Sequence, residues 1–296
     1  MSVLPAFSSL WKDPPPALAF ELSEAGIALA RTGKSPDFDF RPLPPGVITV
    51  SPLRDNIAEP DKLAGAIRGM VPRNGGRKRR DAALILPDAC VRVSVLDFDN
   101  FPSDPKEQLP LVRFRIRKSV PYDVESAILS YFPQACQGTK KIDVVVALAP
   151  AEILARYEAP FRSNAIEPGL VTTSALASLD LVKENGIVVV AKLSGRILTI
   201  LVLSSGILKL VRSLELGEPG VAEIAADLYP TFVYIEDNLD GRAEKLLLCG
   251  FGALAVAARE QFTRELGMPV ELIRTGTGPA AENSMGLLGY LQSLQA

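Results

Sequence analysis

Histidine is absent from this 296-residue sequence, and its absence removes several classes of enzyme. Without it, no Ser-His or Cys-His nucleophile pair can form. Zinc and iron sites that use imidazole ligands are excluded as well. A general acid or base would have to be a carboxylate or a lysine. Many familiar hydrolase mechanisms are therefore ruled out before any motif is considered.

The sequence also has few cysteines and a net charge close to zero. The three cysteines, Cys90, Cys136 and Cys249, form neither a CxxC pair nor an even set, which is typical of reduced thiols in a cytosolic protein. The 32 basic and 34 acidic residues leave a net charge of −2, which argues against a general nucleic-acid-binding role. Cys249 lies in a run of leucines, and we expect it to be a buried small hydrophobe.

One apolar stretch, 187–210, is long enough to cross a bilayer. However, Lys192 and Arg196 lie within it, and a charge at the centre of a membrane is costly. Two turn dipeptides, Ser194-Gly195 and Ser205-Gly206, also interrupt its β-branched runs. The pattern therefore predicts three short strands joined by tight turns and no transmembrane segment. Residues 1–16 lack the regions of a secretory signal, and we expect a flexible leader there.

Blocks of strands followed by helices occur twice in the sequence. The predicted strands are 17–31 (strand, turn, strand), 82–87, 91–98, 126–132, 142–149 and 170–173, then 187–193, 197–204, 207–216 and 246–249. The predicted helices are 61–70, 103–119, 151–164 and 174–181, then 221–240 and 252–266. This order predicts an α/β fold in two lobes, 17–185 and 186–296, with mixed sheets and helices packed on them.

Several motifs in this order resemble the PilM family of type IV pilus assembly proteins, within the actin-like ATPase superfamily. A strand ending in Leu86-Pro87 precedes a second strand, and a helix runs into Val120-Pro121-Tyr122, which matches an Ile-Pro-Phe-like turn of the family. Residues 194–216 resemble its second phosphate hairpin, and residues 246–254 resemble its adenosine loop. The resemblance covers about residues 17–275. It implies an actin-like (duplicated RNase H-like) two-lobe fold, with a small subdomain inserted in the first lobe at about 84–150 and a shortened second lobe.

The resemblance also implies a place for a nucleotide. The matching positions are Glu21, Ser23, Lys192, Ser194, Gly195, Gly250, Phe251 and Gly252. The first hairpin has no glycine before Gly26 and carries Glu24, while the second has Ala191 and Lys192 where the family has an Asp near the metal. Phosphoryl transfer depends on Mg²⁺ and a positioned water. We therefore expect no catalytic residues, no metal ligands and a pseudo-ATPase, whose cofactor is either none or ATP with Mg²⁺ if the degenerate site still binds.

Two readings of Lys192 remain open. The side chain could bind a phosphate directly, which would permit a nucleotide to be held without hydrolysis. The simpler expectation is a lysine at a strand edge that faces solvent. The sequence leaves two alternatives to a pseudo-ATPase: an active actin-like or sugar-kinase-like ATPase that uses Glu21, or a module that holds ATP as a structural ligand.

PilM proteins work in the cytoplasm at the inner-membrane face, where a groove between the first lobe and its inserted subdomain takes up the N-terminal peptide of PilN. The resemblance therefore implies a cytoplasmic scaffold, peripheral at the inner membrane, in fimbrium biogenesis or a type II secretion-like platform. Its partners would be a PilN-like bitopic protein and the assembly ATPases of the machine. Such a groove needs an apolar floor and free strand edges. The candidate lining residues are Leu86, Val93, Val95, Val112 and Ile116.

Basic residues gather at two places in the first lobe. They are Arg77, Lys78, Arg79 and Arg80 in one loop and Arg113, Arg117 and Lys118, together with Arg115, on one predicted helix. On a helix Arg113 and Arg117 are neighbours that repel unless a partner neutralises them. Both groups are expected to be solvated surface, with lipid headgroups or an acidic partner segment as the alternatives. Nucleic acid is a weak alternative because no aromatic residues interleave the loop cluster.

Overall fold

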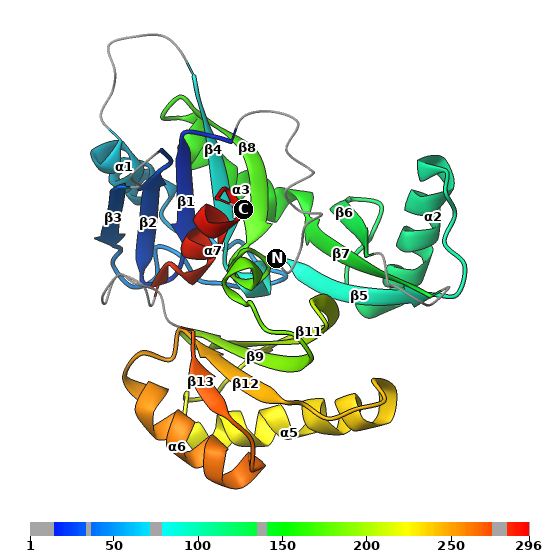
Figure 1. The fold of residues 1–296 in the computed structure, drawn as a ribbon. Coiled ribbons are helices and arrows are strands. Elements are labelled where there is room, and N and C mark those ends of the chain that lie inside the picture. The colour runs from blue at the N-terminus through cyan, green and yellow to red at the C-terminus, as the bar shows by residue number, and fades with distance from the viewer. Residues whose placement is uncertain (1–14, 34–36, 72–78, 135–140, 274–282, 296) are drawn as a thin grey trace.

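The computed structural model describes residues 15–33, 37–71, 79–134, 141–273 and 283–295. Two five-stranded sheets and one three-stranded sheet form its framework. In Figure 1 the first large sheet lies above the second, and the small sheet projects to one side of both. Within the described residues, no helix is long and apolar enough to cross a membrane.

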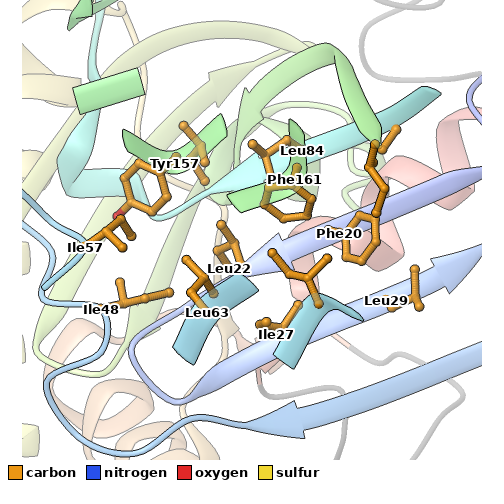
Figure 2. Packing of buried hydrophobic residues seen from close by; sticks show 14 of the residues in the cluster. Phe20, Leu22, Ile27, Leu29, Ile48, Ile57, Leu63, Leu84, Tyr157 and Phe161 are labelled. Carbon is orange, nitrogen blue, oxygen red and sulfur yellow. The ribbon is translucent and has the colours of Figure 1, made fainter. Parts of the chain in front are cut away.

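The first large sheet has the strand order β3-β2-β1-β4-β8. Its strands are β1 (Leu18–Leu22), β2 (Gly26–Arg31), β3 (Asp37–Pro42), β4 (Arg80–Leu86) and β8 (Ile166–Thr173). The first three strands are antiparallel neighbours, whereas β1, β4 and β8 run parallel. Helices α1 (Pro60–Met70) and α3 (Ala151–Arg162) cover one face, where Phe20 and Phe161 meet edge to face at 4.9 Å (Figure 2).

The second large sheet repeats this topology, with the order β11-β10-β9-β12-β13. Its strands are β9 (Ile187–Ser194), β10 (Ile197–Ser204), β11 (Ile207–Glu215), β12 (Lys245–Cys249) and β13 (Val270–Leu272). Again the first three are antiparallel and the last two join in parallel. Helices α5 (Val221–Asn238) and α6 (Ala255–Leu266), preceded by the short turn Gly252–Leu254, cover its outer face. The duplication confirms the predicted actin-like fold class.

The inserted subdomain is a three-stranded antiparallel sheet in the order β5-β7-β6, with one helix on its outer face. Its elements are β5 (Arg92–Phe98), α2 (Pro105–Ile116), the single turn Arg117–Ser119, β6 (Ala127–Gln134) and β7 (Ile142–Pro150). The carboxylate of Asp104 caps α2 by accepting the backbone N–H of Lys106 at 2.9 Å, so the helix begins at Pro105, two residues after the predicted start at Ser103. Val112 and Ile116 of α2 bury against Val144 and Val146 of β7.

The inserted subdomain also docks on the second lobe. Val93 and Val145 belong to one buried cluster with Leu208 and Val211 of β11. The Gln134 side chain pairs with the backbone of Leu208 in both directions: it donates to the carbonyl at 2.8 Å and accepts the N–H at 2.9 Å. The Gln134 amide thus pairs with the backbone of β11 as a neighbouring strand would. The subdomain, which is inserted in the first lobe, is therefore also bonded to the second.

The C-terminal helix α7 (Met285–Ser293) returns to the first lobe, which differs from the assignment of 186–296 to the second lobe. It packs with α4 (Ser174–Ser178) and the turn Leu179–Leu181 on the face of the first sheet opposite α1 and α3. Gly289 permits the contact, because a Cβ there would lie 2.0 Å from the Ala177 carbonyl oxygen.

The sequence patterns located most elements but not all of their partners. The apolar stretch 187–210 forms strands β9 to β11, as predicted, with left-handed turns at Gly195, Ser205 and Gly206. Strand β3, an exposed edge strand, lies in a stretch for which the predicted elements include none. The strands predicted at 82–87 and 91–98 correspond to β4 and β5, which belong to different sheets and are separated by the turn Asp88–Cys90.

We expect Gly289→Ala to destabilise the protein by ~1–3 kcal/mol, because the new methyl group overpacks the contact between α7 and α4. Gly65→Ala is the matched control, since Gly65 lies in α1 with open space around it. That control should gain ~0.5–1 kcal/mol from helix propensity. Urea unfolding measures both, and equal effects would contradict the proposed packing.

Candidate functional site

The tips of two corresponding hairpins face each other between the lobes. One is the β1–β2 turn of Ser23, Glu24 and Ala25, and the other is the β9–β10 turn at Gly195. A Cβ placed on Gly195 would lie 3.6 Å from Oε2 of Glu24, so the two tips are in near contact. Oε1 of Glu24 accepts the backbone N–H of Val50 at 2.8 Å, which fixes the carboxylate beside the second tip. These are the hairpins that the PilM resemblance matched to phosphate binding.

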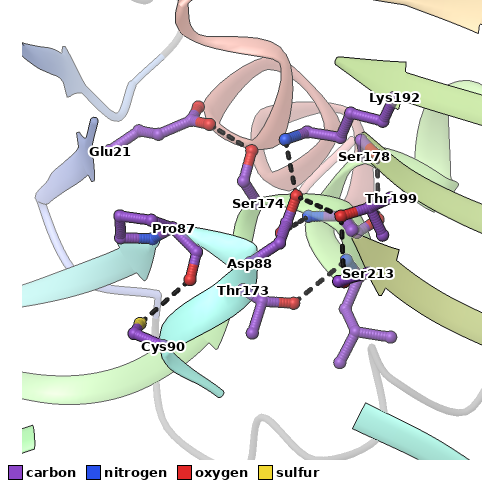
Figure 3. A network of polar contacts seen from close by, with 12 residues as sticks. Glu21, Pro87, Asp88, Cys90, Thr173, Ser174, Ser178, Lys192, Thr199 and Ser213 are labelled. Carbon is purple, nitrogen blue, oxygen red and sulfur yellow. Dashed lines mark hydrogen bonds and ion pairs between the residues drawn. The ribbon is translucent and has the colours of Figure 1, made fainter. Parts of the chain in front are cut away.

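Behind the tips, a buried ion pair joins the lobes. Asp88 begins the turn after β4, and its Oδ2 accepts the Lys192 ammonium of β9 at 2.8 Å. Oδ1 of the same carboxylate accepts the N–H of Ala175 at the start of α4, at 2.6 Å. Thr199 of β10 donates its hydroxyl to Oδ2 at 3.3 Å. Figure 3 shows how Lys192 and Thr199 reach across from the second lobe to Asp88.

Strand alternation explains why Lys192 points between the lobes. Val188 and Val190 share its face of β9 and are buried against the first-lobe residues of α4, whereas Ala191 and Leu193 face α5 and α6. The ammonium is therefore buried, with only 3% of the residue exposed. Burial is the largest single influence and lowers the pKa of Lys192, but the charge and hydrogen bond of Asp88, together with nearby Cys249 and Glu21, outweigh it and raise that pKa above its ordinary value. The side chain is a cation whose partner comes from its own chain.

Glu21 is the second buried carboxylate at this junction. The Ser174 hydroxyl donates to one of its oxygens, and the backbone N–H of Leu287 in α7 donates to the other at 2.6 Å. Burial raises the pKa of Glu21, while Lys192 and the two donors oppose the shift. Glu21 thus ties β1 to α4 and to the C-terminal helix, and its carboxylate is already satisfied by protein donors.

Lys192 is therefore the clearest correction to the sequence analysis. The solvent-facing reading is wrong, because the side chain is buried and ion-paired. The phosphate-binding reading does not fit either, since its charge is neutralised by Asp88. Asp88 was not among the predicted site residues. The signal for it was present, because a lysine inside an apolar strand requires a buried acid elsewhere in the chain.

The other predicted nucleotide residues have structural tasks or lie at turns. The Ser23 hydroxyl closes the β1–β2 turn by bonding with the N–H and carbonyl of Gly26, each at 3.2 Å. Phe251 is buried in the second lobe with its ring edge-to-face to Phe262 at 6.4 Å. Three further residues lie at hairpin or strand ends: Ser194, Gly195 and Gly250. Gly252 begins the short turn before α6.

Taken together, these residues do not fit ATP with Mg²⁺. The carboxylate of Glu24 lies beside Gly195, where the resemblance would place phosphate, and like charges repel there. The second hairpin offers Lys192 in place of a metal-binding acid, and that lysine is engaged. Among the described residues, no group of three Cys, Asp or Glu side chains is arranged to hold a metal ion.

The five predicted groove residues are not brought together. Leu86 is buried in the first lobe, and Val93 and Val95 pack toward the second lobe. Val112 and Ile116 lie on the buried face of α2, against the inserted sheet. Four of the five are core residues, so they cannot form the floor of one open groove. Their apolar character reflects packing in the protein core and not the lining of a groove.

The predicted basic residues divide in the same way. Arg113 is partly buried and pairs with Glu125 at 3.0 Å. This ion pair neutralises Arg113 and so reduces the expected repulsion from Arg117. Arg79 pairs with Glu167 at 3.5 Å, and Arg80 is half-buried in β4. Arg117 and Lys118 are exposed after α2. Arg77, Lys78 and Cys136 lie outside the described residues, whereas Cys249 is buried, as predicted.

The fold has known structural counterparts. A chain of the PilM–PilN type IV pilus biogenesis complex matches with a TM-score of 0.76 and 19% identity, over 95% of this chain and 99% of that chain. A Bacteroides thetaiotaomicron protein with an actin-like ATPase fold and unknown function matches with a TM-score of 0.53 and 13% identity, over 92% and 94% of the two chains. No protein-family model and no curated protein sequence matches this chain. At these identities the similarity establishes the actin-like fold, and it confirms the predicted resemblance to PilM at that level.

We expect Lys192→Met to destabilise the protein by ~3–5 kcal/mol, because it leaves the Asp88 carboxylate buried without its counter-ion. The double variant Asp88→Asn with Lys192→Met should lose less than the sum of the single losses. Lys62→Met, at the exposed ion pair with Glu59, is the matched control and should change stability by less than ~1 kcal/mol. Urea unfolding of all variants measures the coupling, and additive losses would contradict the ion pair.

The stability of wild type relative to Glu21→Gln should depend on pH. Because the pKa of Glu21 is raised in the folded state, the native protein holds this proton longer than the unfolded chain. The free energy of unfolding of wild type minus that of the variant should therefore be largest below pH 4.5 and decline as pH rises through the folded pKa. Urea unfolding between pH 4 and 8 tests this, with Glu24→Gln as an exposed-carboxylate control. If this free-energy difference rises with pH, the pKa of Glu21 is lowered and not raised on folding, and the prediction is wrong.

Proposed function

We propose that this protein is a non-hydrolysing scaffold of the actin-like fold, which binds a peptide of a membrane-anchored partner in a pilus or secretion platform. The observation that carries the proposal is the buried Asp88–Lys192 pair between the lobes. The pair engages Lys192, the charged side chain of the second phosphate hairpin, in an ion pair within the protein. The protein keeps the actin-like fold but lacks, in the hairpins described above, free side chains for phosphate and metal binding, and this combination suits a protein that binds partners.

ATP turnover is disfavoured by the charges around the hairpin tips. Glu21, Glu24 and Asp88 place three carboxyl groups near the hairpin tips, and Lys192 is already paired with Asp88. Moving Lys192 toward a phosphate would leave Asp88 buried without its counter-ion, which costs several kcal/mol. The same cost applies to ATP held as a structural ligand.

A peptide-binding role is supported by the similarity to a PilM chain that was solved as a PilM–PilN complex. By analogy, the partner of this chain would be the N-terminal cytoplasmic peptide of a PilN-like inner-membrane protein. That assignment places the protein in the cytoplasm at the inner-membrane face, in a type IV pilus or related secretion machine, with the assembly ATPases of the machine as further partners.

The inserted sheet offers a specific place for the peptide. Strand β6 is an edge of the order β5-β7-β6, and an edge strand can accept an additional strand by backbone pairing. Ala127 and Leu129 pack toward α2, so Ile128 between them points to the opposite face. Its side chain is 53% exposed, which is unusual for isoleucine in a sheet. We assign the β6 edge and Ile128 to the peptide site, in place of the buried residues predicted from the sequence.

Calorimetric titration tests the proposal. We expect no heat and no thermal stabilisation with Mg²⁺ and ATP, and micromolar binding of the partner's N-terminal peptide. An actin-like ATPase in the same buffer controls for active nucleotide. Tight ATP binding with a silent peptide would overturn the scaffold proposal.

Ile128→Asp should weaken peptide binding at least about tenfold, because it places a charge where an apolar side chain of the peptide would pack. Val256→Asp is the matched control, since Val256 is 59% exposed on α6 in the other lobe. A scrambled peptide controls for composition. Undiminished binding by Ile128→Asp would exclude the β6 site.

A further inference from the structure

Helix α2 carries an exposed aromatic ring among positive charges. Phe114 is 73% exposed, although Val112 and Ile116 on either side of it are fully buried against the inserted sheet. Residues 105–119 include five cations and one acid, in a chain whose net charge is −2. Pro110, one turn before Phe114, is also exposed. The outward side of this helix therefore combines an apolar residue with a strong local charge.

Two of the five cations are used by the fold. Arg113 donates to the Val124 carbonyl at 2.9 Å and pairs with Glu125. Arg115 lies 5.1 Å above the Phe98 ring and pairs with Asp97 at 3.5 Å. Arg117 and Lys118 differ, because neither side chain forms an ion pair with any acid in the described part of the chain. These two exposed cations follow Phe114 by three and four residues, the spacing of neighbours on a helix.

The position of α2 decides what kind of partner fits. Figure 1 shows the helix on the outer side of the inserted sheet, at the end of the molecule farthest from both lobes. A projecting helix can meet a flat surface without interference from the rest of the protein. An exposed aromatic ring with flanking cations suits a bilayer, whose headgroup region accepts rings and whose anionic lipids attract Arg and Lys.

We propose that Phe114, Arg117 and Lys118 form a docking surface for membranes that contain anionic phospholipids. The cations provide attraction to the headgroup phosphates, and the ring enters the interface. This surface is on the face of the inserted sheet opposite Ile128, so lipid contact would leave the β6 edge free. The proposal rests on charge and exposure at α2 and is independent of the peptide site.

Vesicle flotation tests the docking surface with the full-length protein. We expect binding to vesicles of phosphatidylcholine with 30% phosphatidylglycerol, none to phosphatidylcholine alone, and release at 0.5 M salt because ions screen exposed charges. Arg117→Gln with Lys118→Gln should lower partitioning roughly 25-fold, since each basic residue near an anionic surface adds about fivefold. Phe114→Ser should lower it about tenfold.

Matched controls come from α6 in the second lobe. Arg259→Gln with Arg264→Gln removes the same two charges from exposed positions, and Val256→Ser removes an exposed apolar side chain; both should float like wild type. Equal thermal unfolding of all variants verifies folding. The proposal is overturned if wild type fails to float, or if the Arg117/Lys118 variant floats as well as wild type. Retention on immobilised polyglutamate without flotation would assign the surface to an acidic protein segment and also overturn it.

Discussion

The buried pair of Asp88 and Lys192 is the interaction on which the arrangement of this molecule depends. It links the turn after β4 in the first lobe to β9 in the second, and the carboxylate also accepts the N–H at the start of α4. A buried charge is costly unless its counter-charge and hydrogen bonds are in place. The two lobes therefore cannot separate at this point without exposing or isolating an ion.

Other contacts act in the same direction. Glu21 holds β1 to α4 and α7, and Gln134 joins the inserted sheet to the backbone of β11. Lys209 of β11 adds an ion pair with Asp143 of β7. Together these bonds connect both lobes and the insert through buried or half-buried polar groups. The result favours one fixed relative placement of the parts, which suits a protein that presents surfaces to partners more than one that closes on a nucleotide.

The sequence predicted local structure well where the pattern was strong. The interrupted apolar stretch 187–210 could be assigned to strands because two turn dipeptides and two charges excluded a membrane helix. Predictions failed where partners are distant in the chain. Leu86, Val112 and Ile116 were assigned to a groove because an apolar residue looks the same whether it lines a groove or fills a core. Ile128 was missed because exposure depends on what packs against each face of β6.

By itself, the sequence determined the chemistry that is excluded and the order of the elements. The lack of histidine, the missing acid in the second hairpin and the twice-repeated strand pattern are properties of the chain read locally. Only the tertiary structure decided that Lys192 is bound to Asp88, that α7 belongs with the first lobe, and which apolar residues are exposed. The physical reason is that the first two outcomes depend on contacts between residues 104 and 266 positions apart, and the third on which elements pack together, none of which local periodicity encodes.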